Sequence, residues 1–258
     1  RGLGNPDFDL AASQPVSIVM DDIVQENVIL KSFPLFDIES VEVSRGPQGT
    51  LFGRNTTAGI IKFDSARPGH DQDGYVSATI GNLGTVNAEG AANISLSENM
   101  AMRVSLFTQN RDNWIDNGFQ NTQDALGGFN EYAGRVQLLV TPSDNFDVLF
   151  NVHARSLEGT SAVFRANILT TGSNALNANY DRNRVFYDSQ FNNPQEYESW
   201  GASIRANLDL DGMTLTSITG FETADGFSLG DIDGGNLSGP GFIPFPSETQ
   251  DGIETLDQ

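Results

Sequence analysis

The chain has 258 residues, a formal net charge of −20, 27 glycines and no cysteine. The lack of cysteine excludes disulfides and thiol chemistry, and the negative charge disfavours nucleic acid as a partner because phosphate backbones would be repelled. No apolar run approaches the ~18 residues of a membrane helix, and no signal-peptide pattern opens the chain. Position 1 is an arginine rather than an initiator methionine, so we expect the sequence to be a piece of a longer chain.

The first part of the chain, up to Pro68, contains short and mixed apolar runs. Strands are predicted in "PVSIVMDDI", "SVEVS" and "GIIKF", and a helical turn is predicted in "PLFDIE". Between the last two strands lies "RGPQGTLFGRNTTA". We expect Gly46, Pro47 and Gly49 to form a tight turn there, since glycine adopts backbone angles that other residues avoid and proline fixes its own. This turn would place Arg45 at the surface.

After Pro68 the pattern changes to long segments with a period of two. In "AMRVSLFTQ", Met102, Val104 and Leu106 alternate with Arg103 and Ser105. The same alternation occurs in "TVNAEGAANISL", "FDVLFNVHARS" and "WGASIRANLDL", and more faintly in "YVSATIG", "YAGRVQLLV" and "MTLTSITGFE". Because alternate residues of a strand face opposite sides, each segment predicts a strand with one apolar and one polar face.

Strand length and connection length favour a transmembrane β-barrel over a soluble sandwich. Barrel strands run to roughly 9–12 residues with this period, whereas globular strands usually have about 5–6. The connections alternate between short turns ("LSENM", "TPSDN", "LDG") and long segments (109–130, 157–196 and 225–247), with "GNLG" as a short exception. Outer-membrane barrels show this alternation of short turns and long loops.

Aromatic residues lie near the ends of the predicted strands. They are candidates for the aromatic girdles of a barrel, and packing at strand ends is the alternative. They are Tyr75, Tyr132, Phe146, Tyr197, Trp200 and Phe221.

The segment from residue 41 to residue 68 carries an ordered motif over 28 positions. Its residues are Glu42, Val43, Arg45, Gly46, Pro47, Gly49, Leu51, Phe52, Gly53, Arg54, Asn55, Gly59, Ile61, Arg67 and Pro68. The segment resembles the C-terminal half of the plug domain of TonB-dependent outer-membrane receptors, and "RGLG" at the start resembles an arginine-glycine element of the same plug. The chain departs from the family where Asp21-Asp22 replaces the usual Asp-Gly turn, and at Ala58 and Lys62.

The resemblance implies an antiparallel transmembrane β-barrel with an N-terminal α/β plug, of which this chain is a partial, unclosed fragment. Residues 1–69 would form the C-terminal half of the plug, and residues 70–258 the first seven strands of the barrel, with an eighth beginning near Glu248. Such barrels have about 22 strands. An open sheet leaves unpaired backbone groups at its edges, so we expect the isolated chain neither to insert into a membrane nor to transport.

The resemblance also implies roles for individual residues. Arg1 and Arg45 would form a latch between plug and barrel by facing wall glutamates beyond Gln258, because guanidinium groups bind carboxylates in a bidentate manner. The residues of the plug turn would be Glu42, Gly46, Pro47, Gly49, Gly53 and Gly59. The apex that faces the substrate would include Asn5, Phe8, Gln25, Glu26 and Asn27.

The implied function is energy-coupled uptake of a scarce ligand across the bacterial outer membrane. The ligand would be a siderophore-iron complex, cobalamin, haem or a glycan. The implied partner is a TonB-type inner-membrane complex that acts through a segment upstream of Arg1, and outer-membrane lipid would surround the barrel. A passive porin, a receptor that also signals and a non-functional remnant are the alternatives.

Sequence patterns for catalysis and metal binding are weak. "GFSLG" fits the nucleophile elbow of hydrolases, but no helix-forming sequence and no histidine follow it, so we expect a loop there. "DIDGG" lacks the later ligands of a calcium loop. We therefore predict neither an enzyme nor a cofactor or metal site.

Overall fold

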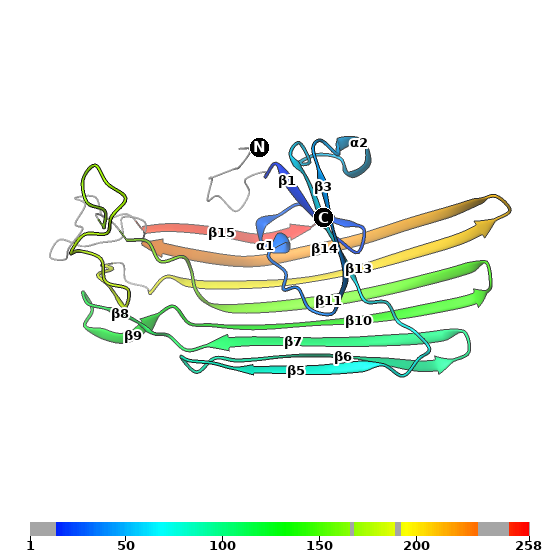
Figure 1. Cartoon of the computed structure of the whole chain (residues 1–258), viewed down its shortest axis with the longest axis horizontal. Helices are drawn as coiled ribbons and strands as arrows, with labels where there is room; N and C mark the ends of the chain where they lie inside the picture. The colour runs from blue at the N-terminus through cyan, green and yellow to red at the C-terminus, as the bar shows by residue number, and fades with distance from the viewer. Residues whose placement is uncertain (1–13, 166–167, 189–191, 232–247, 258) are drawn as a thin grey trace.

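The computed structural model describes residues 14–165, 168–188, 192–231 and 248–257. A small four-stranded sheet stands against one face of a large eight-stranded sheet, and a three-stranded sheet lies at one end of the large one (Figure 1). In the part of the chain that the structure describes, no helix is long and apolar enough to cross a membrane.

The four-stranded sheet has the order β2-β1-β4-β3. Its elements are β1 (Val16–Met20), β2 (Ile23–Gln25), β3 (Ile38–Arg45) and β4 (Gly59–Ser65), with α1 (Val28–Lys31) after β2 and α2 (Gly49–Phe52) after β3. β1 and β4 are parallel, and the other neighbours are antiparallel. The predicted helical turn in "PLFDIE" is wrong. The helix lies earlier, where the side chain of Asn27 caps it by accepting a hydrogen bond from the Ile29 N–H at 2.6 Å.

Glycines allow the chain to turn between β3 and β4. Gly46 has a φ of 94° and its N–H donates to the Ala58 carbonyl at 3.0 Å. Gly59 has a φ of 147°, and a Cβ there would overlap with the Ser44 carbonyl oxygen. Both positions therefore require glycine, because a side chain would be strained at either and would collide with backbone at the second.

The eight-stranded sheet has the order β15-β14-β13-β11-β10-β7-β6-β5. Its strands are β5 (Gly74–Ile80), β6 (Val86–Ser97), β7 (Met100–Arg111), β10 (Phe129–Ser143), β11 (Phe146–Thr160), β13 (Pro194–Leu210), β14 (Met213–Asp231) and β15 (Glu248–Asp257). All neighbours are antiparallel. Within the described residues β5 and β15 form two free edges, so the sheet is open, and the predicted fold class is confirmed.

Several strands extend beyond their predicted ends, into segments that we predicted as long connections. β14 runs to Asp231, so "GFSLG" lies in a strand and not in a loop. Two of the predicted long loops, 109–130 and 157–196, also fold together into the three-stranded sheet of β8 (Ile115–Asn117), β9 (Thr122–Leu126) and β12 (Arg184–Val185), in the order β12-β8-β9. Their small core consists of Ile115, Ala125, Leu126, Val185 and Tyr187.

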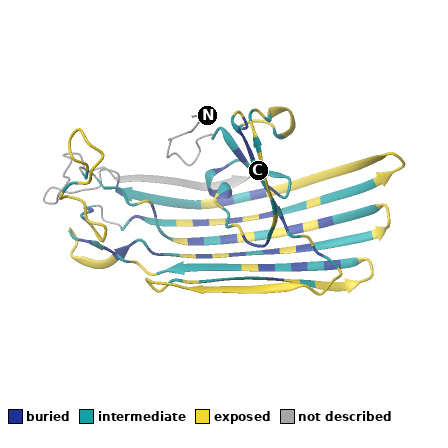
Figure 2. Cartoon of the chain, in the orientation of Figure 1, coloured by how far each residue is buried: buried dark blue, intermediate teal, exposed yellow. Residues whose placement is uncertain are grey.

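The two faces of the large sheet differ in the way the alternation predicts. We call the face that contacts the small sheet the inner face, and the opposite one the outer face. Buried and exposed residues alternate along the central strands (Figure 2). The outer side chains are apolar and exposed, for example Leu106 at 63% and Val152 at 53%, whereas Arg103 and Arg135 on the inner face are 5% and 3% exposed. A barrel wall shows this reversal of the usual globular pattern.

The predicted aromatic residues divide between the two faces. Tyr132, Trp200 and Phe221 lie on the outer face and are 40–56% exposed. Tyr197 is buried on the inner face, and Tyr75 pairs with the buried Ala91 on that same face. The girdle prediction is therefore wrong for Tyr75 and Tyr197.

Candidate functional site

The cross-strand register gathers polar side chains into rows on the inner face. Alternate residues of a strand share a face, so directly paired residues on neighbouring strands form a row across the sheet. The arginine row consists of Arg103, Gln137, Asn151, Ser203 and Gly220, and the histidine row consists of Ser105, Arg135, His153, Gly201 and Glu222. The small sheet and the segment around α1 lie directly over these rows.

Asp37, just before β3, binds one end of both rows. Arg103 donates from Nε at 2.8 Å and from Nη2 at 2.5 Å to its two carboxylate oxygens, and the Ser105 hydroxyl donates to the same group. The side chains of Arg103 and Asp37 are 6% and 2% exposed. Burial opposes ionisation of Asp37, but the hydrogen bonds from Arg103 and Ser105 outweigh it and lower the pKa of this carboxyl from its ordinary value. Asp37 is thus a buried anion with a bidentate partner.

Arg135 fixes the backbone around Asp37. Its Nη2 donates to the carbonyls of Phe36 at 2.7 Å and Asp37 at 3.3 Å. The guanidinium lies 4.9 Å from the centre of the Phe36 ring, and this ring stacks on Phe107 at 5.5 Å. The φ of Asp37 is 51°, an angle that asparagine and aspartate tolerate better than most residues. A single short segment thus engages two arginines on neighbouring strands.

The acidic turn between β1 and β2 forms a second ionic contact. Asp22 pairs with Arg205 on β13, and with Lys62 at 3.0 Å. Asp21 accepts a hydrogen bond from Asn151 Nδ2 at 3.0 Å. The second aspartate, at which the sequence departs from an Asp-Gly turn, has a φ of 69°, which is in the left-handed region. This departure adds a carboxylate that reaches the wall.

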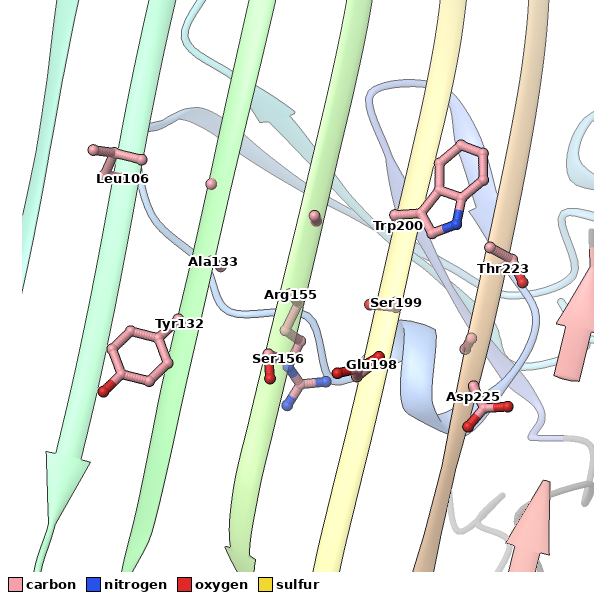
Figure 3. A pocket seen from close by; sticks show the side chains of 13 residues that line it. Leu106, Tyr132, Ala133, Arg155, Ser156, Glu198, Ser199, Trp200, Thr223 and Asp225 are labelled. Atoms are coloured by element: carbon pink, nitrogen blue, oxygen red, sulfur yellow. The ribbon is translucent and has the colours of Figure 1, made fainter. Parts of the chain in front are cut away.

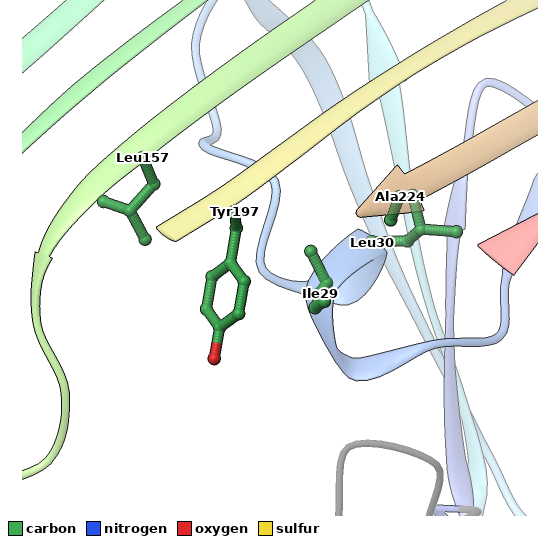
Figure 4. Close-up of a cluster of buried hydrophobic side chains, with 5 residues drawn as sticks. All are labelled: Ile29, Leu30, Leu157, Tyr197 and Ala224. Carbon is green, nitrogen blue, oxygen red and sulfur yellow. The ribbon is translucent and has the colours of Figure 1, made fainter. Parts of the chain in front are cut away.

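Closer to the three-stranded sheet, α1 and apolar side chains form the contact between the segment after β2 and the inner face of the large sheet. Arg155 donates to the Ile29 carbonyl at 3.2 Å and to Ser32 Oγ at 2.8 Å, and pairs with Glu131 at 2.7 Å. Around this polar contact, α1 packs against β11, β13 and β14. The apolar cluster consists of Ile29, Leu30, Leu157, Tyr197 and Ala224 (Figure 4).

Glycines in β13 and β14 give the inner face room for these contacts. His153 Nε2 and Glu222 Oε2 are 3.0 Å apart although their strands are not neighbours, because Gly201 lies between them. A Cβ on Gly201 would overlap with the Glu222 carboxylate, and one on Gly220 would overlap with Ile23. The ring of Phe33 meets His153 edge-on at 5.1 Å between centroids.

The residues that we predicted for the site are only partly placed by the structure. Arg1, Asn5 and Phe8 lie outside the described residues. Arg45 is exposed at the end of β3, as are Glu42, Pro47, Gly49 and Gly53, while Gly46 is half-buried and Gly59 is buried. The latch stays a prediction, because its expected partners lie beyond Gln258.

The predicted apex residues differ in their surroundings. Gln25 and Asn27 are buried, and Asn27 has a structural role as the cap of α1. Glu26 pairs with the exposed Arg54. Among the described residues, no group of three or more His, Asp or Glu side chains is arranged to hold a metal ion.

Sequence reasoning missed the ionic contacts that the structure does show. They have acids on the small sheet and its loops and arginines on the wall, which is the opposite arrangement to the predicted latch. The available signal was the presence of Arg103, Arg135, Arg155 and Arg205 on the polar sides of alternating segments of a strongly acidic chain.

Comparison with known proteins identifies similar molecules. Residues 1–60 match the family model described as the TonB-dependent Receptor Plug Domain. The pesticin receptor of Yersinia pestis is 30% identical over 111 residues, which cover 43% of this chain and 16% of the relative. The ferrioxamine receptor of Yersinia enterocolitica is 27% identical over 125 residues, covering 48% of this chain and 16% of the relative. The matches thus span about a sixth of these relatives.

Solved structures share the fold over most of the chain. The ferric yersiniabactin uptake receptor FyuA from Yersinia pestis has a TM-score of 0.73 at 19% identity, covering 84% of this chain and 33% of that one. The open form of the ferric-catecholate import receptor Fiu from E. coli K12 has a TM-score of 0.72 at 18% identity, covering 96% of this chain and 39% of that one.

Proposed function

We propose, from the premise that this chain is part of a TonB-dependent receptor, that it serves the energy-coupled uptake of a ferric siderophore across the bacterial outer membrane. Residues 1–69 would be the C-terminal half of the plug, and residues 70–258 the first strands of the barrel. A relative that is a ferrioxamine receptor, and a solved structure of similar fold that is a ferric yersiniabactin uptake receptor, favour siderophores over cobalamin, haem or glycans.

One observation carries the proposal: the small sheet occupies the polar inner face through matched and buried contacts. A passive barrel needs a polar inner wall, but has no use for a buried bidentate pair such as Asp37–Arg103 that ties a separate sheet to this wall. The contact indicates a plug that must stay in place at rest. This favours gated uptake over a porin.

In this mechanism the wall holds the plug at rest and releases it during uptake. The chain performs no chemistry on the ligand. The carboxylates of Asp21, Asp22 and Asp37 exchange their wall partners for water when the plug moves, which lowers the free energy of separation compared with an all-apolar interface. A TonB-type inner-membrane complex would supply the work by pulling on a segment upstream of Arg1. The ligand would bind at the loops and the plug apex.

The test is uptake of radiolabelled iron in a strain whose other ferric-siderophore receptors are deleted. The full-length receptor containing this chain is expressed, and ferric yersiniabactin, ferrioxamine and a ferric catecholate are supplied separately. We expect uptake of at least one of them, and its abolition by a proton uncoupler or by deletion of the TonB gene. Uptake that persists in both conditions would indicate a passive barrel. If none of the three ferric siderophores is taken up but cobalamin or haem is taken up in an energy-dependent way, the siderophore assignment is wrong and energy-coupled uptake still holds.

A further inference from the structure

The arginines of the wall all project to one side. In the described strands of the large sheet, arginine occurs only at inner-face positions, which are Arg103, Arg111, Arg135, Arg155 and Arg205. On the outer face, the exposed charged side chains beside a groove of about 610 Å³ near Tyr132 and Trp200 are the acids Glu198 and Asp225 (Figure 3). Positive charge is therefore concentrated on the side that the plug covers, although the whole chain has a net charge of −20.

Three of these arginines form a diagonal line on neighbouring strands. Arg155 on β11 pairs with Ala133, which is two residues before Arg135 on β10. Arg135 in turn pairs with Ser105, which is two residues after Arg103 on β7. Diagonal neighbours of this kind lie about 7–8 Å apart. We call Arg155, Arg135 and Arg103 the arginine diagonal. Its three positive charges repel one another unless other groups balance them.

One continuous segment of the plug, residues 29–37, covers the arginine diagonal at rest. Each of the three guanidinium groups donates to oxygen atoms of this segment. The acceptors are the carbonyls of Ile29, Phe36 and Asp37, the hydroxyl of Ser32 and the carboxylate of Asp37. The segment thus presents a series of oxygen acceptors to the diagonal, and one of them carries a negative charge.

The wall itself balances only one of the three charges. Glu131 pairs with Arg155 at 2.7 Å. The wall partner of Arg103 is the neutral amide of Asn93 at 2.9 Å, and Arg135 Nε has no hydrogen-bond partner. Among the described residues, no carboxylate of the wall pairs with Arg103 or Arg135. Displacement of the plug segment therefore leaves two neighbouring guanidinium groups on the inner face without a paired counter-charge.

Stability of the resting plug does not require this arrangement. Buried ion pairs gain little net free energy, and α1 already docks on the wall through apolar side chains. Arginines that are costly to bury at rest become useful when the plug is displaced, because a guanidinium binds anionic oxygens through paired N–H groups. Pores for anions are lined by arginine or lysine, with several sites that each bind weakly enough to release the anion.

We propose that the arginine diagonal is a transit site for anionic ferric complexes, which replace the oxygen acceptors of residues 29–37 when the plug moves. This inference rests on the proposed function, and it narrows the ligand to a complex with net negative charge and with carboxylate or catecholate oxygens at its surface. The complex moves from Arg155 past Arg135 to Arg103, from the side of the three-stranded sheet toward the short turns. Successive contacts with neighbouring arginines balance its charge along the wall.

Charge-selective labelling of a cysteine on the diagonal tests the site in the full-length receptor. Ser105→Cys is nearly isosteric and lies between Arg135 and Arg103. This chain has no cysteine of its own, and any cysteine elsewhere in the receptor is replaced. Energised cells that are supplied with the three ferric siderophores are treated with an anionic sulfonate or a cationic trimethylammonium methanethiosulfonate. We expect the anionic reagent to react about tenfold faster, after correction for the rates at Asn99→Cys in an exposed turn.

The ratio of the two rates separates charge from plug movement, because the time that the plug spends displaced affects both reagents equally. Arg135→Gln should lower the ratio about threefold, since one of the two charges beside the cysteine is lost. Arg135→Lys is the matched control, because it retains the charge and should retain the ratio.

Three labelling results would overturn the proposal: equal rates for both reagents, the same ratio in Arg135→Gln and Arg135→Lys, or no labelling of Ser105→Cys in energised cells. Iron uptake confined to ferrioxamine B, which is a cation, would also overturn it. Energy-dependent iron uptake without a charge preference in labelling refutes the transit site alone. A charge preference together with uptake that persists after uncoupling refutes the proposed function alone.

Discussion

The contact between plug and wall has two halves with different chemistry. On the side of the short turns, carboxylates meet arginines and amides, as in Asp37–Arg103 and Asp22–Arg205. On the side of the three-stranded sheet, Ile29 and Leu30 of α1 pack on apolar wall residues. The ionic half gains little net free energy, because desolvation of the charges opposes their attraction. The apolar half gains free energy from the area that it removes from water.

This difference assigns the two halves different tasks. Buried ionic contacts have strict geometry, so a plug that is displaced leaves charges unpaired, and one position is favoured over its neighbours. Apolar contact tolerates small shifts but resists complete separation. A plug that is seated at rest and moves under a pulling force, as we propose for this chain, would benefit from both. The predictions below separate the halves in the full-length receptor, from the largest expected effect to the smallest.

Removal of the wall arginine that pairs with Asp37 should have the largest effect. Arg103→Met leaves the Asp37 carboxylate buried without its bidentate partner, and we expect the free energy of plug docking to fall by about 3–5 kcal/mol. Hydrogen exchange of the β3 amides reports this free energy. The double variant Arg103→Met, Asp37→Asn should recover most of the loss, because no uncompensated charge remains and asparagine tolerates the φ of 51° at this position. If the plug docked as weakly in the double variant as in the single one, the loss could not be due to an unpaired buried charge.

Truncation in the apolar half should have a somewhat smaller effect. Ile29 is 1% exposed, and Ile29→Ala should lower the free energy of docking by about 2–4 kcal/mol, since transfer and cavity terms add. The loss should be the same at low and high salt. Leu35→Ala is the control, because Leu35 is 50% exposed and its truncation should change little. A strong salt dependence for Ile29→Ala would show that the halves are not separable.

Acid should weaken the ionic half selectively. The pKa of Asp37 is lower in the folded protein than its ordinary value, so its carboxylate stabilises docking above that ordinary value, and this contribution is lost as the pH falls through the lowered pKa. We expect the protection factors of the β3 amides, which take account of the intrinsic pH dependence of exchange, to fall below about pH 4. Asp37→Asn should dock more weakly at neutral pH and lose this dependence, whereas Ile29→Ala should retain it.

The sequence predicted the wall well, because a strand in a barrel leaves a repeated signature. The alternation of Met102, Val104 and Leu106 with Arg103 and Ser105 correctly predicted which side chains lie on the outer face of the strand and which lie on the inner face. Periodicity did not reveal where each strand ends, since polar residues continue along β14 and β11 into the predicted loops. The three-stranded sheet was missed because two segments far apart in the sequence form its core, and neither has a periodic pattern of its own.

The contacts of the site were less predictable than the fold. Asp37 lies in "PLFDIE", where nothing local distinguishes it from a surface acid, and its partner is 66 residues away. Its burial arises only when the small sheet meets the wall. The motif "RGPQGTLFGRN" identified the plug, but its residues shape a turn at the surface of β3 and β4. A motif that maintains backbone geometry can therefore reveal a family without revealing which side chains join its parts.

Substitution in the acidic turn between β1 and β2 should have the smallest effect on plug docking. It tests whether all ionic contacts of this half contribute equally. Asp22 and Arg205 are 19% and 27% exposed, unlike the buried Asp37 and Arg103. Water and salt screen such a pair, so Asp22→Asn should reduce the free energy of docking by about 0.5–1 kcal/mol, and less at high salt. Exchange of the β2 amides at two salt concentrations measures it, with Glu98→Gln in the exposed turn after β6 as a control for net charge. A loss as large as that of Arg103→Met would mean that the turn, rather than Asp37, fixes the position of the plug. Asp22 would then be the main specificity element of the contact.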